Sequence, residues 1–240
     1  MLCTDRIIVL SRTRYSDSSI IIQALSRQHG RISLMVYGLG GKNRSRLGAF
    51  HTMALLDVVY SYRQERQVQK LSEYKSSPIL TDCTIDLRKS TMLMFLAEVV
   101  SKSIREEAED DAQFEFIDTS IQILEQLQSG IQLFHIAFLL KLSRYLGFSP
   151  TQLVPGQQFF DLEAGHGTIV RPVHRHYIAA EQFAQLYQFL DLPFNQLNQI
   201  KITRTERDFL LETVLIWYSF HIPTMKEINS LSVLHDVFNG

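Results

Sequence analysis

The apolar residues of this 240-residue chain change their spacing near residue 78, and that change divides the chain into two parts. From about residue 6 to 75, short runs of β-branched and aromatic residues alternate with turn residues, which is typical of β-strands. Beyond Ser76-Ser77-Pro78, apolar residues recur every three or four positions, which is typical of amphipathic helices. The sequence therefore predicts a β domain over residues 1–78 and an all-α helical domain over residues 79–240.

Five short strands are predicted in the first part. They cover Ile7–Leu10, Ile20–Ile22, Ile32–Val36, Leu55–Tyr60 and about Gln67–Tyr74. Turn residues separate these runs, and the third run alternates apolar with other residues, as a strand with one buried face does. Five short antiparallel strands favour a closed barrel, because closure leaves no strand unpaired on one side.

Helices are predicted in the second part at 87 to about 107, 114–128, 131–146, 180–190 and 204–220, with a short one at 226–237. The helix at 131–146 has clear stop signals, because Gly147 follows it and Pro150 lies just beyond. Residues 150–178 are rich in Gly, Pro and His and contain no cysteine. We expect an irregular insert there.

Charge is divided between the same two parts. Residues 1–78 hold 12 lysines and arginines against 5 acidic residues, a net +7, whereas the remainder holds 12 against 20, a net −8. Seven unbalanced charges on so small a domain repel one another and require a reason. A basic β part joined to an acidic helical part suggests that one end binds a polyanion and the other contacts proteins.

The basic residues of the first part lie at strand ends and in loops, where small barrels bind ligands. Together with one tyrosine they are the predicted nucleic-acid site: Arg12, Arg14, Arg27, Arg31, Tyr37, Lys42, Arg44, Arg46, Arg63 and Arg66. Their cations would pair with phosphates, and Tyr37, like Tyr60, Tyr62 and Tyr74, could stack on unpaired bases. An alternative stays open for each residue, in which the arginines keep the protein soluble and the tyrosines belong to the core.

The glycine-rich stretch Gly38-Leu39-Gly40-Gly41-Lys42 follows a strand and suggests a nucleotide-binding loop. A P-loop needs a second glycine directly before Lys-Ser/Thr and then a helix, whereas Lys42 is followed by Asn43-Arg44-Ser45-Arg46. The dinucleotide fingerprint is also missing. The stretch is better interpreted as a flexible basic loop between strands.

Other residues could carry chemistry but lack the surrounding pattern. His166, His174 and His176 lie near Asp161 and Glu163, and such residues can bind zinc. No cysteine accompanies them, and Arg175 would place a cation between two ligands, so exposed loop histidines are favoured. Asp161 and Glu163 are interpreted as solvated rather than as an acid–base pair. We therefore expect no metal, no cofactor and no enzymatic activity.

The run from Glu106 to Asp111 is interpreted as a solvated acidic turn between two helices. Cys3 and Cys83 are the only cysteines, too few for a disulfide framework, which fits a reducing cytoplasm. The longest apolar runs have about five residues against the roughly 20 of a membrane span, and charges near the amino terminus argue against a signal peptide. These features predict an intracellular, cytoplasmic protein.

Several segments resemble one known family. They are Arg12-Thr13-Arg14-Tyr15-Ser16-Asp17-Ser18-Ser19, then Arg27-Gln28-His29-Gly30-Arg31, then Val36-Tyr37-Gly38 with the loop through Lys42, Arg44, Ser45 and Arg46, and finally the helix from Phe134 through Leu146-Gly147 to Pro150. In type and order they resemble the RecO recombination mediator family over most of the chain.

The resemblance implies an OB-fold barrel followed by a helical domain. It implies binding of single- and double-stranded DNA, annealing of complementary strands and help in loading RecA onto DNA coated by single-strand-binding protein, with nucleoid association. It also implies RecR and the acidic tail of single-strand-binding protein as partners. Many relatives carry a four-cysteine zinc motif after the Leu-Gly-x-x-Pro helix, and residues 151–177 here have no cysteine.

The tail-binding site is predicted on physical grounds, since an acidic tail with a terminal aromatic residue suits an apolar notch bordered by cations. Lys141, Arg144 and Tyr145 could provide it, although these cations could equally complement the carboxyl end of their own helix. Two other functions stay open: an OB-fold adaptor that acts mainly through protein contacts, and an RNA-binding OB protein.

Overall fold

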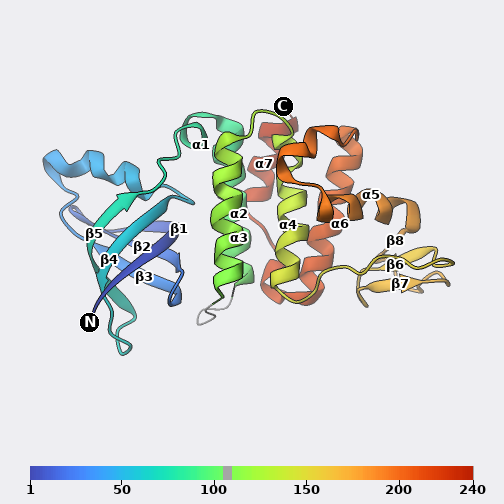
Figure 1. Cartoon of the computed structure of the whole chain (residues 1–240), viewed down its shortest axis with the longest axis horizontal. Helices are drawn as coiled ribbons and strands as arrows, with labels where there is room; N and C mark the ends of the chain where they lie inside the picture. Colours follow the sequence, from blue (N-terminus) through green and yellow to red (C-terminus); the bar gives the residue numbers. More distant parts are fainter. Residues whose placement is uncertain (105–109, 240) are drawn as a thin grey trace. The chain divides into compact units, whose positions relative to one another are not determined.

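The computed structural model describes residues 1–104 and 110–239, and its amino-terminal part is a closed barrel of the OB type (Figure 1). The strands are β1 (Leu2–Ser16), β2 (Ser19–Ser26), β3 (Gly30–Val36), β4 (Leu55–Ser61) and β5 (Val68–Ser76). They close in the order β1-β2-β3-β5-β4. The predicted five-stranded barrel is confirmed, and each strand extends beyond the apolar run that predicted it.

One pair in the ring corrects the prediction of an antiparallel barrel. Strands β3 and β5 run parallel, with Ser33 opposite Val68 and Met35 opposite Lys70, and the other four pairs are antiparallel. The reason is topological, since directions cannot alternate all the way around a ring with an odd number of strands. A closed five-stranded barrel must therefore contain a parallel pair.

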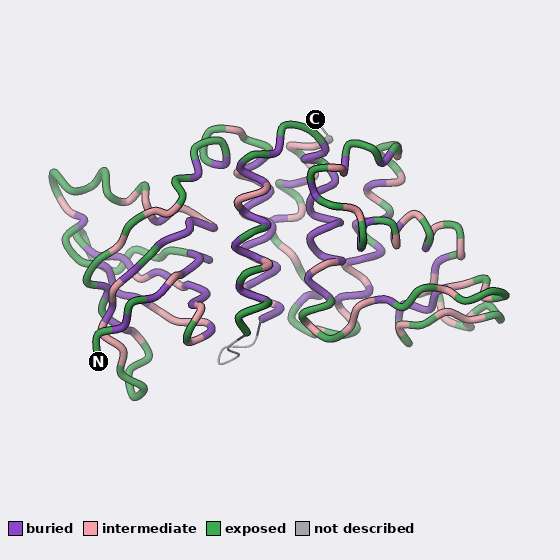
Figure 2. The backbone as a smooth tube through the Cα atoms, in the orientation of Figure 1, coloured by how far each residue is buried: buried purple, intermediate pink, exposed green. Residues whose placement is uncertain are grey.

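Alternating apolar residues fill the barrel. Ile7 and Val9 of β1 lie in the interior, as do Leu34 of β3 and Leu56 of β4, and all four are fully buried. Ile8 on the opposite face of β1 is also fully buried, because a helix packs against that strand. Figure 2 shows the resulting alternation of buried and exposed backbone along the strands.

The chain divides into two compact units, Met1–Glu125 and Gln126–Gly240. The first unit contains the barrel together with η1 (Gly41–Phe50), α1 (Asp82–Ile85), α2 (Leu87–Ser103) and nearly all of α3 (Asp111–Gln126). The boundary at residue 78 stays a prediction. Most of the acidic run 106–111 lies outside the described residues, but Asp110 accepts the N–H of Gln113 and so caps α3.

The second unit is mainly helical. Its helices are η2 (Ile131–Leu133), α4 (Phe134–Tyr145), α5 (Ala180–Asp191), η3 (Phe194–Gln199), α6 (Arg204–His221), η4 (Pro223–Lys226) and α7 (Ser230–Asn239). Helix α4 is buried on nearly all sides, as expected of a helix that is apolar all around. It ends where predicted, with Gly147 in the left-handed conformation at φ +82°.

The segment predicted to be irregular contains a small sheet. Strands β6 (Phe159–Asp161), β7 (His166–Thr168) and β8 (Tyr177–Ala179) pair in the order β7-β6-β8. Strands β6 and β7 form a hairpin, and the chain then returns so that β8 pairs with the other side of β6. This sheet corrects the prediction of an all-α domain with an irregular insert. Within residues 1–104 and 110–239, the helices lack the combination of length and hydropathy that a membrane span requires.

Candidate nucleic-acid interface

A cavity of about 340 Å³ in the first unit brings together three of the predicted arginines. We call it the arginine cavity, after Arg12, Arg14 and Arg44 in its lining. Arg12 and Arg14 lie two residues apart on β1, opposite Ile22 and Ile20 of β2, so both point to the same face of the strand. Arg44 comes from η1, a separate element. The cavity is therefore formed by residues distant in sequence.

The guanidinium groups of the arginine cavity form few contacts with the rest of the protein. Arg12 donates from Nη1 to the carbonyl oxygen of Leu47 at 2.8 Å, and Arg14 pairs from Nη2 with Asp17 Oδ1 at 2.7 Å. Both partners of the Arg14–Asp17 pair are exposed, and such pairs contribute little. Arg44 is exposed and forms no ion pair within the described part of the chain. These cations are thus accessible to an anionic ligand.

The basic loop between β3 and β4 is ordered as η1, which corrects the prediction of a flexible loop. Its start packs against the β1–β2 turn, because Leu39 donates its N–H to the carbonyl of Ser18 and a Cβ atom on Gly40 would lie 2.9 Å from Ser18 Cβ. Its end is held by Phe50, which is fully buried in the barrel. Gly40 therefore allows this segment to pack closely on the β1–β2 turn, and the stretch does not form a nucleotide loop.

Lys42 and Arg46 are exposed on η1 on either side of Arg44 in the sequence, and neither lines the arginine cavity. Tyr37, at the end of β3, is 58% exposed. Arg63 is exposed between β4 and β5. These four predicted residues are at the surface, and none of them lines the arginine cavity.

A second cavity, of about 420 Å³, lies on β2, β3 and the β4–β5 loop. We call it the His29 cavity, after His29 in its lining, and it also contains Arg31, Tyr62 and Arg66. The rings of His29 and Tyr62 stack with centroids 3.9 Å apart. This is the face on which OB folds hold oligonucleotides, and two predicted arginines, Arg31 and Arg66, meet there.

A buried carboxylate positions His29. Tyr60 donates its hydroxyl hydrogen to Oδ2 of Asp5 at 3.0 Å, and Ser26 donates to the same oxygen at 2.5 Å. The Tyr60 oxygen lies 2.8 Å from Nδ1 of His29, so that nitrogen carries a hydrogen and donates it. Burial raises the pKa of Tyr60 above its ordinary value, which keeps this hydroxyl protonated. Sequence reasoning missed the network because its members lie on different strands.

Two predicted arginines contact the helices of their own unit. Arg27 pairs with Asp111 at 2.9 Å and with Glu115 at 2.7 Å, both in α3, and Arg31 donates from Nη1 to the carbonyl of Ser101 in α2. Arg6, which was not predicted, pairs with Asp118 and with Asp57. The charges of Arg6 and Arg27 are therefore shared with carboxylates, and these side chains connect the barrel to α3.

Two of the three residues predicted for the tail site, Lys141 and Arg144, contact the carboxyl end of a neighbouring helix. Lys141 donates from Nζ to the carbonyl of Leu190 at 2.7 Å, and burial lowers its pKa. Arg144 pairs with Asp191 at 2.8 Å, and Tyr145 is 38% exposed. Unpaired carbonyls at a helix end favour nearby cations, so the two residues complement α5 rather than their own helix.

A cavity of about 600 Å³ in the second unit was not predicted. It lies along α6, η4 and α7, and Phe209, Leu215, Met225 and Leu231 give it an apolar wall. No run of sequence marks it, because its lining comes from three separate elements.

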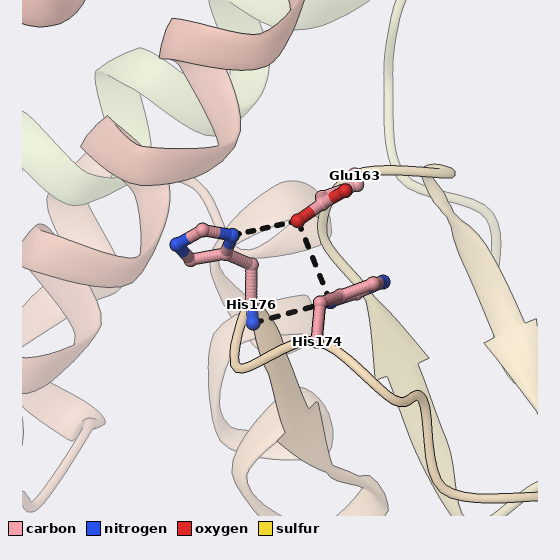
Figure 3. A group of neighbouring side chains, drawn as sticks. All are labelled: Glu163, His174 and His176. Carbon is pink, nitrogen blue, oxygen red and sulfur yellow. Dashed lines mark hydrogen bonds and ion pairs between the residues drawn. The ribbon is translucent and has the colours of Figure 1, made fainter.

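Three of the residues considered for zinc lie together in the small sheet (Figure 3). One ligand atom from each of Glu163, His174 and His176 lies within 4.8 Å of the others. Glu163 Oε1 is 2.7 Å from Nδ1 of His176 and 3.5 Å from Nδ1 of His174. His166 is exposed, and its Nδ1 lies 3.2 Å from the carbonyl oxygen of Gly167.

Asp161 also lies beside the cluster of Glu163, His174 and His176. Its Oδ2 lies 3.1 Å from Nε2 of His174, while Oδ1 accepts the backbone N–H groups of Glu163 and Ala164. Burial acts to raise the pKa of Asp161, but these N–H groups, Ala164 foremost, hold it below its ordinary value. An ionised Asp161 therefore orients His174.

The closed barrel, its basic cavity and the helices that follow define a two-part OB-barrel protein. Residues 1–78 match the family described as Recombination protein O N terminal, and residues 85–227 match Recombination protein O C terminal. The chain therefore belongs to the recombination protein O (RecO) family of DNA repair proteins.

Individual relatives are similar to this chain over at least 97% of their length. The chain is 28% identical to the DNA repair protein RecO of Azobacteroides pseudotrichonymphae, with all of both chains covered. It is 31% identical to that of Bacteroides fragilis, with 97% of each chain covered, and 29% identical to that of Christiangramia forsetii, with 99% and 100% covered. The resemblance inferred from the sequence is confirmed at the level of the family.

Proposed function

We propose that this protein is a non-enzymatic recombination mediator that binds single- and double-stranded DNA and anneals complementary strands. Membership in a DNA repair family supports a role on DNA. The observation that carries the proposal is the arginine cavity, where Arg12, Arg14 and Arg44 converge from two elements. Guanidinium groups bind phosphate oxygens in pairs, and their contacts are independent of base sequence.

The basic surface accounts for annealing in physical terms. Two DNA strands repel each other, and a cationic surface that neutralises phosphates on both removes that barrier while they pair. Lys42, Arg44 and Arg46 are exposed along η1, next to the arginine cavity that Arg44 lines, and form no ion pairs in the described part of the chain. They supply charge for the second strand.

The His29 cavity supplies the contact to unpaired bases. The stacked rings of His29 and Tyr62 offer a flat face, and Arg31 and Arg66 lie in the same cavity to hold the backbone. Stacking on aromatic side chains is the usual way in which OB folds hold single strands without reading their sequence. The proposed path of a single strand therefore includes both cavities.

The helical unit serves protein partners in this proposal. The acidic tail of single-strand-binding protein docks at Lys141, Arg144 and Tyr145, where half-exposed Arg144 and Tyr145 offer a cation beside an aromatic ring. Docking concentrates the barrel on coated single strands, which raises its effective concentration there. Together with RecR, the protein then helps RecA onto that DNA. Nucleoid association follows from the same contacts.

The test is an annealing assay with complementary oligonucleotides over a salt series, combined with fluorescence anisotropy on one labelled strand. Replacing Lys42, Arg44 and Arg46 by alanine should slow annealing and lower the slope of log affinity against log salt by about 2, since each phosphate contact contributes about 0.7. The control replaces Lys70, Lys75 and Arg88, three exposed cations outside both cavities.

An unchanged slope in the first variant, or an equal fall in the control, would contradict the proposed site. Competition by matched RNA separates the functions left open by the sequence. Equal or stronger competition by RNA would favour an RNA-binding protein. Failure to bind either polymer would favour an adaptor that acts through protein contacts.

A further inference from the structure

We propose that His29 binds a phosphate group of the single strand as an imidazolium, so that DNA binding takes up a proton, and that Asp5 and Tyr60 position His29 for this contact. The inference rests on the proposed function, because its ligand is the single strand that the His29 cavity is proposed to hold. It adds a proton to that contact and gives the buried network behind the cavity a role in binding.

One carboxylate holds His29 at two points. Oδ2 of Asp5 accepts the hydroxyl hydrogens of Ser26 and Tyr60, and each of these hydroxyl oxygens contacts a nitrogen of His29. Ser26 Oγ accepts the backbone N–H of His29 at 2.9 Å, and the Tyr60 oxygen lies 2.8 Å from Nδ1 of the ring. Both the main chain and the ring of His29 are therefore fixed relative to Asp5.

These hydrogen bonds determine what the second ring nitrogen can offer to a ligand. Because the Tyr60 hydroxyl hydrogen is directed at Asp5, the Tyr60 oxygen accepts the hydrogen on Nδ1 of His29. In the neutral ring Nε2 then carries only a lone pair, and it has no hydrogen-bond partner within residues 1–104 and 110–239. A phosphate oxygen only accepts hydrogen bonds, so it needs a hydrogen on Nε2, which protonation of the ring supplies.

Charges of both signs lie around His29. Asp5 is buried, forms no ion pair in the described part of the chain and is one hydroxyl group away from the ring, which favours an imidazolium. Arg31 and Arg66 line the cavity with His29 and disfavour a third cation. A bound phosphate offsets the two arginines, because it adds negative charge beside all three groups. Binding of a strand is therefore coupled to protonation of His29, and the coupling is reciprocal.

The other titratable groups around the ring keep a constant charge near neutral pH. Burial raises the pKa of Cys3, whose thiol donates to the neighbouring Gln28, and burial also raises the pKa of Tyr60, so both stay neutral. Tyr62 stacks on the ring as an uncharged phenol. His51 is the other histidine of residues 1–78, it does not line the His29 cavity, and burial lowers its pKa. It therefore provides a matched control.

The experiment measures binding of a labelled oligothymidylate to the full chain by fluorescence anisotropy between about pH 8 and about pH 5.5, at constant salt. Thymine and the phosphodiester group do not titrate in this range, so a proton taken up on binding belongs to the protein. We expect the affinity to rise about tenfold as the pH falls, because a nearby opposite charge changes the proton affinity of a group by at least about that factor. Calorimetry in two buffers with different enthalpies of ionisation should show net proton uptake.

His29→Gln should make the affinity independent of pH in this range, whereas His51→Gln should keep the pH dependence of the wild type. Asp5→Asn removes a charge at nearly constant size and should move the rise in affinity to lower pH, because the imidazolium loses its carboxylate. If Asp5→Asn fails to fold, Tyr60→Phe, which removes only one hydroxyl group, interrupts the same link. A purely structural role of Asp5 and Tyr60 would instead change the affinity equally at every pH.

A wild-type affinity that is the same at every pH, or a pH dependence that persists in His29→Gln, would overturn the inference and leave the proposed function intact. Loss of the pH dependence in His51→Gln rather than in His29→Gln would do the same. Failure of the wild-type chain to bind the oligonucleotide at any pH would contradict the proposed function itself, and the inference with it.

Discussion

Arg6 of β1 contacts Asp118 of α3 through its Nε at 2.9 Å, and this pair links the barrel to a helix of the same compact unit. Asp118 is almost fully buried, with 6% of its side chain exposed. A carboxylate left buried without its partner is costly, whereas an exposed ion pair contributes little. Stability and DNA binding should therefore depend on different arginines of the barrel.

Arg6→Ala should lower the free energy of unfolding by about 2 kcal/mol, between the values for exposed and fully buried pairs. Urea denaturation followed by circular dichroism measures it. Arg14→Ala is the control, because its pair with Asp17 is exposed and should contribute less than about 1 kcal/mol. Equal losses in both variants would show that the Arg6 contact has no special structural role.

Arg44→Ala should weaken single-strand binding more than Arg27→Ala does. Arg44 is exposed without an ion-pair partner in residues 1–104 and 110–239, whereas Arg27 already pairs with Asp111 and Glu115. We expect the salt slope to fall by about 0.7 for Arg44→Ala and to stay near the wild-type value for Arg27→Ala. Anisotropy titrations at several salt concentrations decide between them, and the reverse order would remove the arginine cavity from the DNA path.

Tyr62→Ala should reduce affinity for single strands about tenfold, since stacking of one base on an aromatic ring contributes about 1–3 kcal/mol. Tyr62→Phe keeps the ring that stacks on His29 and should bind as the wild type does. Affinity for a fully paired duplex, whose bases are not available for stacking, should change in neither variant. A loss on duplex equal to that on single strands would show that Tyr62 does not contact bases.

Because of His135, the free energy of unfolding should decrease at acidic pH. It is fully buried in α4, and burial lowers its pKa to about 3, against 6.5 for an exposed histidine. Below pH 6.5 the exposed His135 of the unfolded chain binds a proton, whereas the buried His135 of the folded chain stays neutral down to about pH 3. The contribution of His135 to the free energy of unfolding is therefore complete above pH 6.5 and declines as the pH falls toward 3.

The expected contribution of His135 is about 1.4 kcal/mol per pH unit within that window. Urea denaturation from pH 7 to pH 4 measures it, and His135→Leu should remove this part of the slope. His166→Ala, at an exposed site, should leave the slope unchanged. An identical pH profile in wild type and His135→Leu would contradict the assignment.

Arg144→Ala should weaken binding of a peptide that carries the acidic tail of single-strand-binding protein by about fivefold, the value of one exposed charge contact. Arg144 and Tyr145 are partly exposed at the end of α4. Arg204→Ala tests the alternative cavity along α6, which Arg204 lines. If Arg204→Ala lowers the affinity for the peptide and Arg144→Ala does not, the tail docks in that cavity.

Local patterns predicted the elements well, because each strand and helix buries a regularly spaced face. The apolar run at Ile32–Val36 marked β3, and Gly147 marked the end of α4. Arg12 and Arg14 were predicted as basic residues at the end of a strand, and the structure places both on one face because they lie two residues apart. In these cases the residues that form the structural feature are neighbours in the sequence.

What the sequence did not predict depends on contacts between distant segments. Arg44 reaches the arginine cavity only because Gly40 allows η1 to pack closely on Ser18. Glu163 meets His176 only because β8, three residues long, returns to β6. Three residues are too few to show a period, and no local rule tells which strand a segment will join.

The ring of the barrel also determines how the chain tolerates being cut. Strand β5 lies between β3 and β4, so a chain ending after Ser61 would leave both of those strands with bare hydrogen-bonding edges. Such edges recruit strands from other molecules. A fragment of this kind is expected to aggregate or to exchange strands between copies, even though it holds most of the apolar core of the barrel.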